Sequence, residues 1–156
     1  MKSVSTGDAR RRRRLLVELR AALREANTHL SFLNQQIGGQ VELKGNDIEC
    51  LDQINRHGPI SPGDLGRRTG LHPATLTGIL DRLERGGWIA RERSPADRRS
   101  VQLRALPERN RELFARYAPM NEVMDGIFDV YTEDQLTTIA DFLRRTADAA
   151  RAAVGS

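Results

Sequence analysis

Hydrophobic residues recur at helical spacing near the start of the chain. Along residues 16–37 they are separated alternately by three and four positions, and they are Leu16, Leu19, Leu23, Ala26, Leu30, Leu33 and Ile37. A narrow apolar stripe of this kind is typical of a helix that packs lengthwise against another helix. Gly38 and Gly39 follow at once and predict the end of this helix.

Two similar stripes occupy the last third of the chain. The first comprises Leu113, Tyr117, Met120, Met124, Ile127 and Tyr131, and the second comprises Leu136, Ile139, Leu143, Ala147, Ala150 and Val154. Pro119 predicts a kink or break in the first, and Thr132-Glu133-Asp134 suits the start of the second. We expect a helical dimerisation region over residues 10–38 and 107–154, after a disordered tail at residues 1–9. Packing across a dimer is favoured over packing within one subunit, because the chain is short and its stripes are long.

Residues 46–106 show a different pattern, in which short amphipathic segments are separated by glycines. Asn46 can cap a first helix that ends near Gly58. Ser61 is followed by Pro62 and, three positions after the serine, by Asp64. This pattern predicts the start of a second helix, which ends at Gly70. His72-Pro73 predicts the start of a third in the same way. Two short helices joined by a glycine-containing turn form a helix-turn-helix pattern.

The third of these helices is predicted to have one apolar and one small, polar face. Its inward residues are Leu76, Ile79, Leu80 and Leu83. Its outward residues are Ala74, Gly78, Asp81 and Arg85, with Thr75, Thr77 and Arg82 on the flanks. A helix with so small an outward face can lie close to the base edges of a DNA major groove.

An arginine-rich hairpin is predicted directly after this helix, in the stretch GGWIARERSPADRRSVQLRAL at residues 86–106. Residues 88–93 and 99–106 would form its strands. Its basic residues are Arg91, Arg93, Arg98, Arg99 and Arg104. The hairpin has too few apolar residues to be buried, and its charge can reach backbone phosphates or the minor groove.

The distribution of charge along the chain also indicates a polyanionic partner. The 156 residues have a net charge of +4, but residues 1–25 and 58–104 are net positive and the remaining segments net negative. Five consecutive arginines, Arg10–Arg14, lie in the first segment. We favour a solvated helix start or tail over an arm that grips phosphates as the interpretation of this run.

Composition limits the other classes of function. Hydrophobic residues make up 38% of the chain and aromatic residues 4%, so the core must be mainly aliphatic and a partner chain can complete it. No apolar run approaches the ~20 residues that span a bilayer. No signal-type segment follows the basic stretch at the start, so we expect a cytoplasmic protein with no membrane partner.

The sequence indicates neither a metal site nor a catalytic centre. Cys50 is the only cysteine, and core packing is favoured for it over redox sensing because it shares a helical face with Leu51 and Ile54. The three histidines lack the spacing of metal ligands. We find no base–nucleophile pair, phosphate-binding glycine loop or carboxylate dyad, and therefore expect no enzyme and no cofactor.

Residues 75–89, TLTGILDRLERGGWI, followed by Arg91, Arg93 and Asp97-Arg98-Arg99, resemble the MarR (multiple antibiotic resistance regulator) family. The order of helices on both sides extends the resemblance over most of residues 10–154. It implies a mostly α fold with a small β-hairpin wing, in which residues 46–106 form a winged helix-turn-helix DNA-binding domain beside the helical dimerisation region. It also implies a homodimeric transcription regulator, usually a repressor, that binds a pseudo-palindromic operator and is often released by a small-molecule effector.

The resemblance assigns residues to DNA contacts. The helix after His72 would be the recognition helix. In the wing motif Asp97-x-Arg99, the arginine would enter the minor groove while the aspartate holds its guanidinium, which lowers the ordering cost of binding. The complete set of DNA-binding candidates is Ser61, His72, Ala74, Thr75, Thr77, Gly78, Arg82, Arg91, Arg93, Asp97, Arg98 and Arg99.

Two features depart from the family pattern. Gly78 replaces a longer polar side chain, often arginine, which removes a possible base contact and costs about 1 kcal/mol of helix stability relative to alanine. Residues 106–109 replace the usual threonine- and glycine-containing junction, so the entry to the next helix is in doubt.

An effector cleft is suggested only by the resemblance, where the first helix, the second helix and the start of the fifth meet. Its candidates, equally explicable as core or interface residues, are His29, Phe32, Gln36, Ile54 and Tyr117. We therefore expect a dimeric transcription regulator with double-stranded DNA, a second copy and a small effector as partners. The alternatives are a sequence-neutral architectural DNA-binding protein and a protein-interaction dimer with the same fold.

Overall fold

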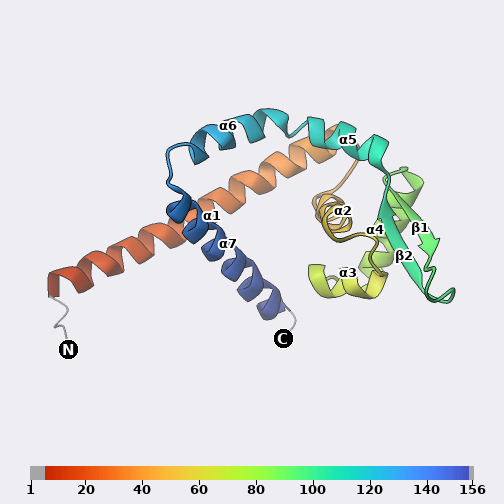
Figure 1. Cartoon of the computed structure of the whole chain (residues 1–156), viewed down its shortest axis with the longest axis horizontal. Coiled ribbons are helices and arrows are strands. Elements are labelled where there is room, and N and C mark those ends of the chain that lie inside the picture. Colours follow the sequence, from red (N-terminus) through yellow and green to blue (C-terminus); the bar gives the residue numbers. More distant parts are fainter. Residues whose placement is uncertain (1–5, 155–156) are drawn as a thin grey trace.

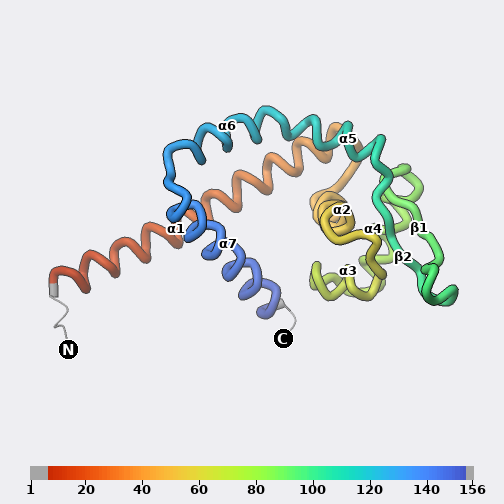
Figure 2. The backbone as a smooth tube through the Cα atoms, viewed as in Figure 1, coloured from red at the N-terminus to blue at the C-terminus, as the bar shows by residue number. Residues whose placement is uncertain are grey.

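The computed structural model describes residues 6–154 as seven helices and one two-stranded antiparallel hairpin. The helices are α1 (Thr6–Gln40), α2 (Gly45–His57), α3 (Pro62–Thr69), α4 (Pro73–Arg85), α5 (Pro107–Ala115), α6 (Ala118–Phe128) and α7 (Glu133–Val154), and the strands are β1 (Ile89–Arg93) and β2 (Val101–Ala105). Helices α2–α4 and the hairpin form a compact unit at one end of the molecule (Figure 1). Helix α1 extends from the far end of the molecule to this unit, α5 and α6 run back away from the unit, and α7 then turns toward α3 (Figure 2). The predicted fold class is confirmed.

Most of the hydrophobic core lies inside the unit formed by α2–α4 and the hairpin, and Ile37 of α1 and Leu113 of α5 extend it. It contains the inward face of α4, whose residues are at most 5% exposed. It also contains residues that are at most 2% exposed, namely Leu51, Leu65, Trp88, Ile89 and Leu103. In the hairpin, Arg91 is opposite Leu103, and Ile60 adds a bridge to Leu103 from the segment before α3. This packing fixes the hairpin against the helices.

The predicted starts and ends of α3 and α4 are confirmed. Ser61 caps α3, with its Oγ accepting a hydrogen bond from the Asp64 N–H at 3.1 Å, and Gly70 ends the helix with φ +68°. His72 caps α4 through Nδ1, which accepts a hydrogen bond from the Ala74 N–H at 3.2 Å. These caps depend on residues close in sequence, which explains why the pattern alone located them.

The predicted end of α1 and start of α2 are both displaced by a few residues. Helix α1 continues through Gly38 and Gly39 to Gln40. Gly38 is needed for close approach and does not stop the helix, because a Cβ there would lie 2.4 Å from the carbonyl oxygen of Leu43. Helix α2 begins at Gly45, and the Asp47 carboxylate, in place of Asn46, accepts the Lys44 N–H at 2.9 Å.

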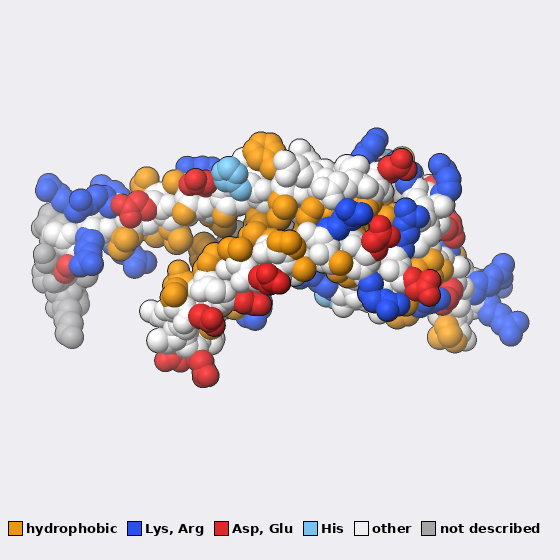
Figure 3. Space-filling view, turned by 90° about the horizontal axis from the view of Figure 1, so that it is seen from above, with side chains coloured by type: hydrophobic (Ala, Val, Ile, Leu, Met, Phe, Trp, Pro, Cys, Tyr) orange, Lys and Arg blue, Asp and Glu red, His pale blue; other side chains and the backbone are white. Residues whose placement is uncertain are grey.

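In the single chain, most residues of α1, α6 and α7 are exposed to solvent. The break near Pro119 is confirmed, since α5 ends at Ala115 and α6 starts at Ala118. Large apolar side chains on α1, α6 and α7 that are at least 36% exposed include Leu15, Leu16, Val17, Leu19, Leu30, Phe32, Val123, Ile127, Phe128, Phe142 and Leu143. Figure 3 shows hydrophobic side chains along the arms that extend away from the winged helix.

The predicted tail falls only partly on described residues. Residues 1–5 lie outside them, whereas residues 6–9 form the first turn of α1, so the helix starts earlier than predicted. Arg10–Arg14 are helical and exposed. Among residues 6–154, no helix has the length and apolar character needed to cross a bilayer.

Candidate nucleic-acid interface

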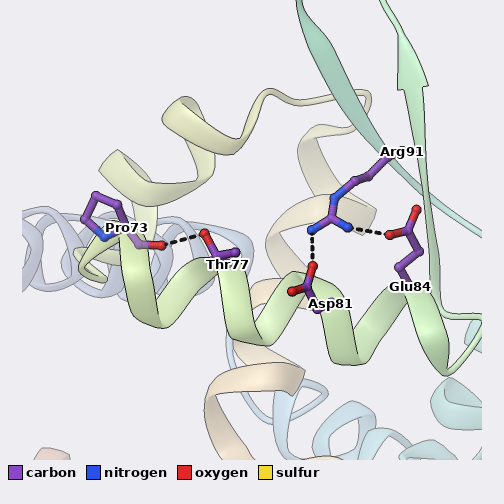
Figure 4. A network of polar contacts seen from close by, with 5 residues as sticks. All are labelled: Pro73, Thr77, Asp81, Glu84 and Arg91. Atoms are coloured by element: carbon purple, nitrogen blue, oxygen red, sulfur yellow. Dashed lines mark hydrogen bonds and ion pairs between the residues drawn. The ribbon is translucent and has the colours of Figure 1, made fainter.

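Helix α4 presents a small, polar surface to solvent. Its four inward aliphatic residues are at most 5% exposed, whereas Ala74, Thr75 and Thr77 are exposed and Gly78 is half-buried. The Thr77 hydroxyl donates to the Pro73 carbonyl oxygen at 2.9 Å (Figure 4). Thr77 is exposed, and its hydroxyl oxygen keeps its lone pairs as acceptors. This face can approach a groove floor closely, with threonine as its longest side chain at these four positions.

Arg82, a predicted DNA contact, is held toward the interior of the protein. Its Nη2 lies 2.7 Å from Oδ1 of Asp47, and its Nε donates to Oδ2 at 3.4 Å. The Asp47 side chain is only 1% exposed, while that of Arg82 is 40% exposed. The hydrogen bond to Asp47 raises the pKa of Arg82 above its ordinary value. A Cβ at Gly78 would lie 3.8 Å from Nη1 of Arg82, so the guanidinium extends back beside the glycine.

Arg91 joins the hairpin to α4. From β1 it donates to Oδ1 of Asp81 at 2.7 Å and also pairs with Glu84, both on α4 (Figure 4). These carboxylates raise the pKa of Arg91, mainly through the hydrogen bond to Asp81. Arg91 is therefore already neutralised by two acids, and its main role in this geometry is to hold the wing against α4.

The turn of the hairpin carries the unpaired positive charge. Arg93, Arg98 and Arg99 are exposed, and within residues 6–154 none of them forms an ion pair. The predicted pairing of the Asp97 and Arg99 side chains is not found. Asp97 Oδ1 instead accepts the backbone N–H of Arg99 at 2.9 Å, because this local turn satisfies the carboxylate first. The aspartate thus orders the backbone of the turn and leaves the guanidinium of Arg99 free.

The remaining arginine of the hairpin, Arg104, is paired across the strands. Its Nη2 lies 2.6 Å from Oε1 of Glu92, and this hydrogen bond lowers the pKa of Glu92 below its ordinary value. Ser61 is also engaged, since its hydroxyl donates to Oδ2 of Asp64 at 2.8 Å while it accepts the N–H of the same residue. Both residues therefore stabilise local structure.

Two exposed arginines of the winged helix that are outside the predicted set also lack an ion pair among the described residues. Arg85 is on the last turn of α4, and Arg68 is on α3; neither has an ion pair in the described part of the chain. The helical pattern predicted the outward position of Arg85, but this residue was not included among the DNA-binding candidates. An open groove of about 540 Å³ separates α3 from α4, and both Thr77 and Arg151 of α7 line it.

The effector candidates are divided between different parts of the structure. His29, Phe32 and Gln36 line one shallow depression on α1. Tyr117 lines a separate cavity between α1, α2 and the α5–α6 junction. Ile54 is 1% exposed and belongs to the hydrophobic core. The structure therefore does not bring the five residues together.

Comparison with known proteins agrees with this architecture. Residues 43–101, from the start of α2 to the start of β2, match the model of the MarR family. The uncharacterized HTH-type transcriptional regulator YcgE of Bacillus subtilis (strain 168) is 32% identical over 125 residues, which cover 80% of this chain and 81% of YcgE. The HTH-type transcriptional repressor MdtR of the same organism is 26% identical over 100 residues, 64% of each protein.

A solved structure extends the similarity beyond the matched segment. The crystal structure of MarR superposes with a TM-score of 0.59 at 26% identity and covers 85% of this chain and 96% of MarR. The long helices on either side of the winged helix are thus included in the likeness. With a helix-turn-helix, an adjoining wing and a relative matched over most of its length, the chain belongs to the MarR family of transcriptional regulators.

Proposed function

We propose that this regulator is a homodimeric repressor that binds a pseudo-palindromic operator through α4 and the wing. The observation that carries the proposal is the group of unpaired arginines at the wing tip, Arg93, Arg98 and Arg99, beside a recognition helix with a small polar face. These guanidinium groups can contact phosphates or enter the minor groove, while Thr75 and Thr77 approach base edges. The proposal involves no catalytic reaction.

The exposed apolar stripes support the dimer. Residues 10–38 and 107–154 would form the dimerisation region, because large apolar side chains of α1, α6 and α7 have no covering element in the described chain. Residues 46–106 would form the DNA-binding domain. Two recognition helices docked in successive major grooves must lie about 34 Å apart, so dimer geometry sets the spacing between half-sites.

Repression and effector release are the remaining parts of the proposal. Among the relatives, MdtR is named a transcriptional repressor, which favours repression over activation. The cavity beside Tyr117 supports release by a small molecule, since it lies where α1 and α5 join the winged helix. A ligand there would alter the distance between the two recognition helices and weaken both half-sites together.

The test compares three DNA duplexes of equal length at one fixed salt concentration. One carries the palindrome identified by mapping genomic binding sites, one carries a single half-site, and one has a scrambled sequence. We expect the palindrome to be bound most tightly, by a dimer detected in sedimentation. Arg99→Gln should weaken binding and reduce the slope of log K against log salt by about one.

A sequence-neutral architectural function is the second candidate. It is favoured by the absence of a long side chain at positions 74, 75, 77 and 78, which limits direct base readout. Equal affinity for the palindrome and the scrambled duplex would support it and exclude the operator-binding repressor. Unchanged binding by Arg99→Gln to every partner would instead favour a protein-interaction dimer.

A further inference from the structure

The cavity between α1, α2 and the α5–α6 junction has a composition that selects among ligands. Its volume is about 360 Å³, which is near the lower end of the roughly 300–1,000 Å³ typical of small-molecule sites. Leu51 and Leu113 form an apolar part of its wall and are at most 2% exposed, and the Phe114 ring lies beside them. A small ligand with an aromatic or aliphatic body therefore fits the cavity.

The charged groups that line the cavity are predominantly acidic. Glu49 and Asp52 lie three positions apart on α2, so their carboxylates are on the same helical face. Arg56 is the one cationic lining residue among those described, and its Nε is 2.9 Å from Oδ2 of Asp52. The Arg56 side chain is 68% exposed and that of Asp52 is 38% exposed, so water screens the arginine charge more than the aspartate charge. Glu49 is exposed and has no ion pair within the described chain.

The cavity is also lined by an uncharged polar group that can accept hydrogen bonds. The Tyr117 hydroxyl donates to Oδ1 of Asn34 at 2.9 Å, which leaves the oxygen lone pairs of Tyr117 available as acceptors. Burial raises the pKa of Tyr117, and the negative charge of Asp52 raises it further. The negative charge of Asp52 therefore acts on Tyr117 at the α5–α6 junction, which lines the same cavity. An ammonium group supplies donors to such acceptors, whereas a carboxylate supplies none.

We propose that this cavity binds a small cationic amine with an apolar or aromatic body. The ammonium group would lie between Asp52 and Glu49, and the body would pack against Leu51, Leu113 and the Phe114 ring. The inference rests on the proposed effector release and specifies the chemical class of the effector. An anionic ligand would bring a second negative charge next to Asp52 and is disfavoured by the same geometry.

The walls of the cavity are connected to the DNA-binding elements by hydrogen bonds. Asn55 of α2 donates to Oδ1 of Asn110 on α5 at 2.8 Å. Asn110 in turn donates to the carbonyl oxygen of Trp88, at the base of the wing, at 2.9 Å. A ligand that separates α2 from α5 would therefore disturb the support of the hairpin, which provides a physical route to weaker DNA binding.

The test uses three probes that share a phenyl body and differ in charge: 2-phenylethylamine, 2-phenylethanol and phenylacetate. Binding to the full-length, DNA-free protein is measured by NMR titration of ¹⁵N-labelled chain, together with calorimetry. We expect the amine to bind about 10-fold more tightly than the alcohol, the equivalent of one good charge-assisted hydrogen bond, and the carboxylate to bind most weakly. Shifts should be concentrated on residues of α2 and the α5–α6 junction.

Two substitutions at the cavity should act in opposite directions. Asp52→Asn should remove the preference for the amine over the alcohol, whereas Arg56→Gln should strengthen amine binding because it removes the competing cation. Asp141→Asn is the matched control. Asp141 forms the same i,i+4 contact with Arg145 on α7, also at 2.9 Å, and lines none of the cavities described above. It should leave all three affinities unchanged.

Several outcomes would overturn the proposal. These are tighter or equal binding of phenylacetate, no binding of any probe at the cavity, and an amine affinity that is insensitive to Asp52→Asn. Because the DNA-free protein is used, these outcomes are independent of operator recognition. Amine binding that does not release bound DNA would contradict effector release and leave the chemistry of the cavity standing.

Discussion

The ion pair between Arg82 and Asp47 predicts an asymmetric response to mutation. Arg82→Met removes the guanidinium and leaves the Asp47 carboxylate, 1% exposed, with only the Lys44 N–H as a partner. Asp47→Asn instead leaves Arg82 without a charged partner, but the Arg82 side chain is 40% exposed and can be hydrated. The arginine substitution should therefore be the more destabilising of the two.

The magnitudes follow from burial. Breaking a fully buried pair by removing one partner destabilises a protein by about 3–5 kcal/mol. Solvent reaches this pair from the arginine side and weakens it, so we expect Arg82→Met to lower the free energy of unfolding by about 2–3 kcal/mol. Asp47→Asn keeps the shape of the side chain and one acceptor oxygen, which can serve the Lys44 N–H and Nε of Arg82. Its NH2 group would face Nη2 of Arg82, which water can reach, and the expected effect is about 1 kcal/mol. In the double variant the two effects should not add, because the buried charge is no longer present.

Trp88 provides the assay. It is the only tryptophan and is 2% exposed, so its fluorescence reports unfolding of the winged helix in a urea titration. Protomer concentration must be held constant, since association contributes to stability. An Arg82→Met variant that unfolds at the same urea concentration as Asp47→Asn would show that the buried carboxylate does not depend on the arginine.

The structure makes three further predictions. Gly38→Ala should lower the free energy of unfolding by about 1–3 kcal/mol through steric overlap, whereas Gly39→Ala, with open space around its Cα, should raise it by up to about 1 kcal/mol; equal urea midpoints for the two variants would refute the argument. Burial raises the pKa of the Cys50 thiol to about 12, so at pH 8 the native protein should react with iodoacetamide far more slowly than the urea-unfolded chain, and comparable rates would show that the thiol is accessible. Because Arg104 lowers the pKa of Glu92, the stability from this contact is present above the ordinary glutamate pKa and is lost as the pH falls; Arg104→Gln should raise the pKa of Glu92 in an NMR titration, and an unchanged value would contradict the pairing.

Local patterns in the sequence were sufficient for the elements of the winged helix. The apolar face of α4 and the caps at Ser61 and His72 depend on residues within four positions of one another. Such short-range interactions depend on the local sequence alone, so periodicity and capping preferences predict them well. The wing was predicted for a related reason, since its strands are adjacent in sequence.

The partners of charged residues could not be obtained from such patterns. Arg82 contacts Asp47, which is 35 positions away, and Arg91 contacts Asp81 and Glu84 on a different element. For Asp97 and Arg99 the sequence spacing was compatible with a side-chain pair, but the backbone N–H was the nearer donor. The sequence contains 21 acidic residues with which an arginine could pair. Only the fold decides which of them lies next to a given arginine.

The sequence by itself determined the helical stripes, the helix-turn-helix with its basic hairpin, and the resemblance that identifies the family, because these are properties of neighbouring residues. Only the tertiary structure decided which arginines of the described chain are paired with acids, why Gly38 is a glycine, and which side chains share the cavity beside Tyr117. The physical reason is that burial and pairing depend on segments far apart in the chain. Their relative positions are set when the core of the winged helix packs as one unit.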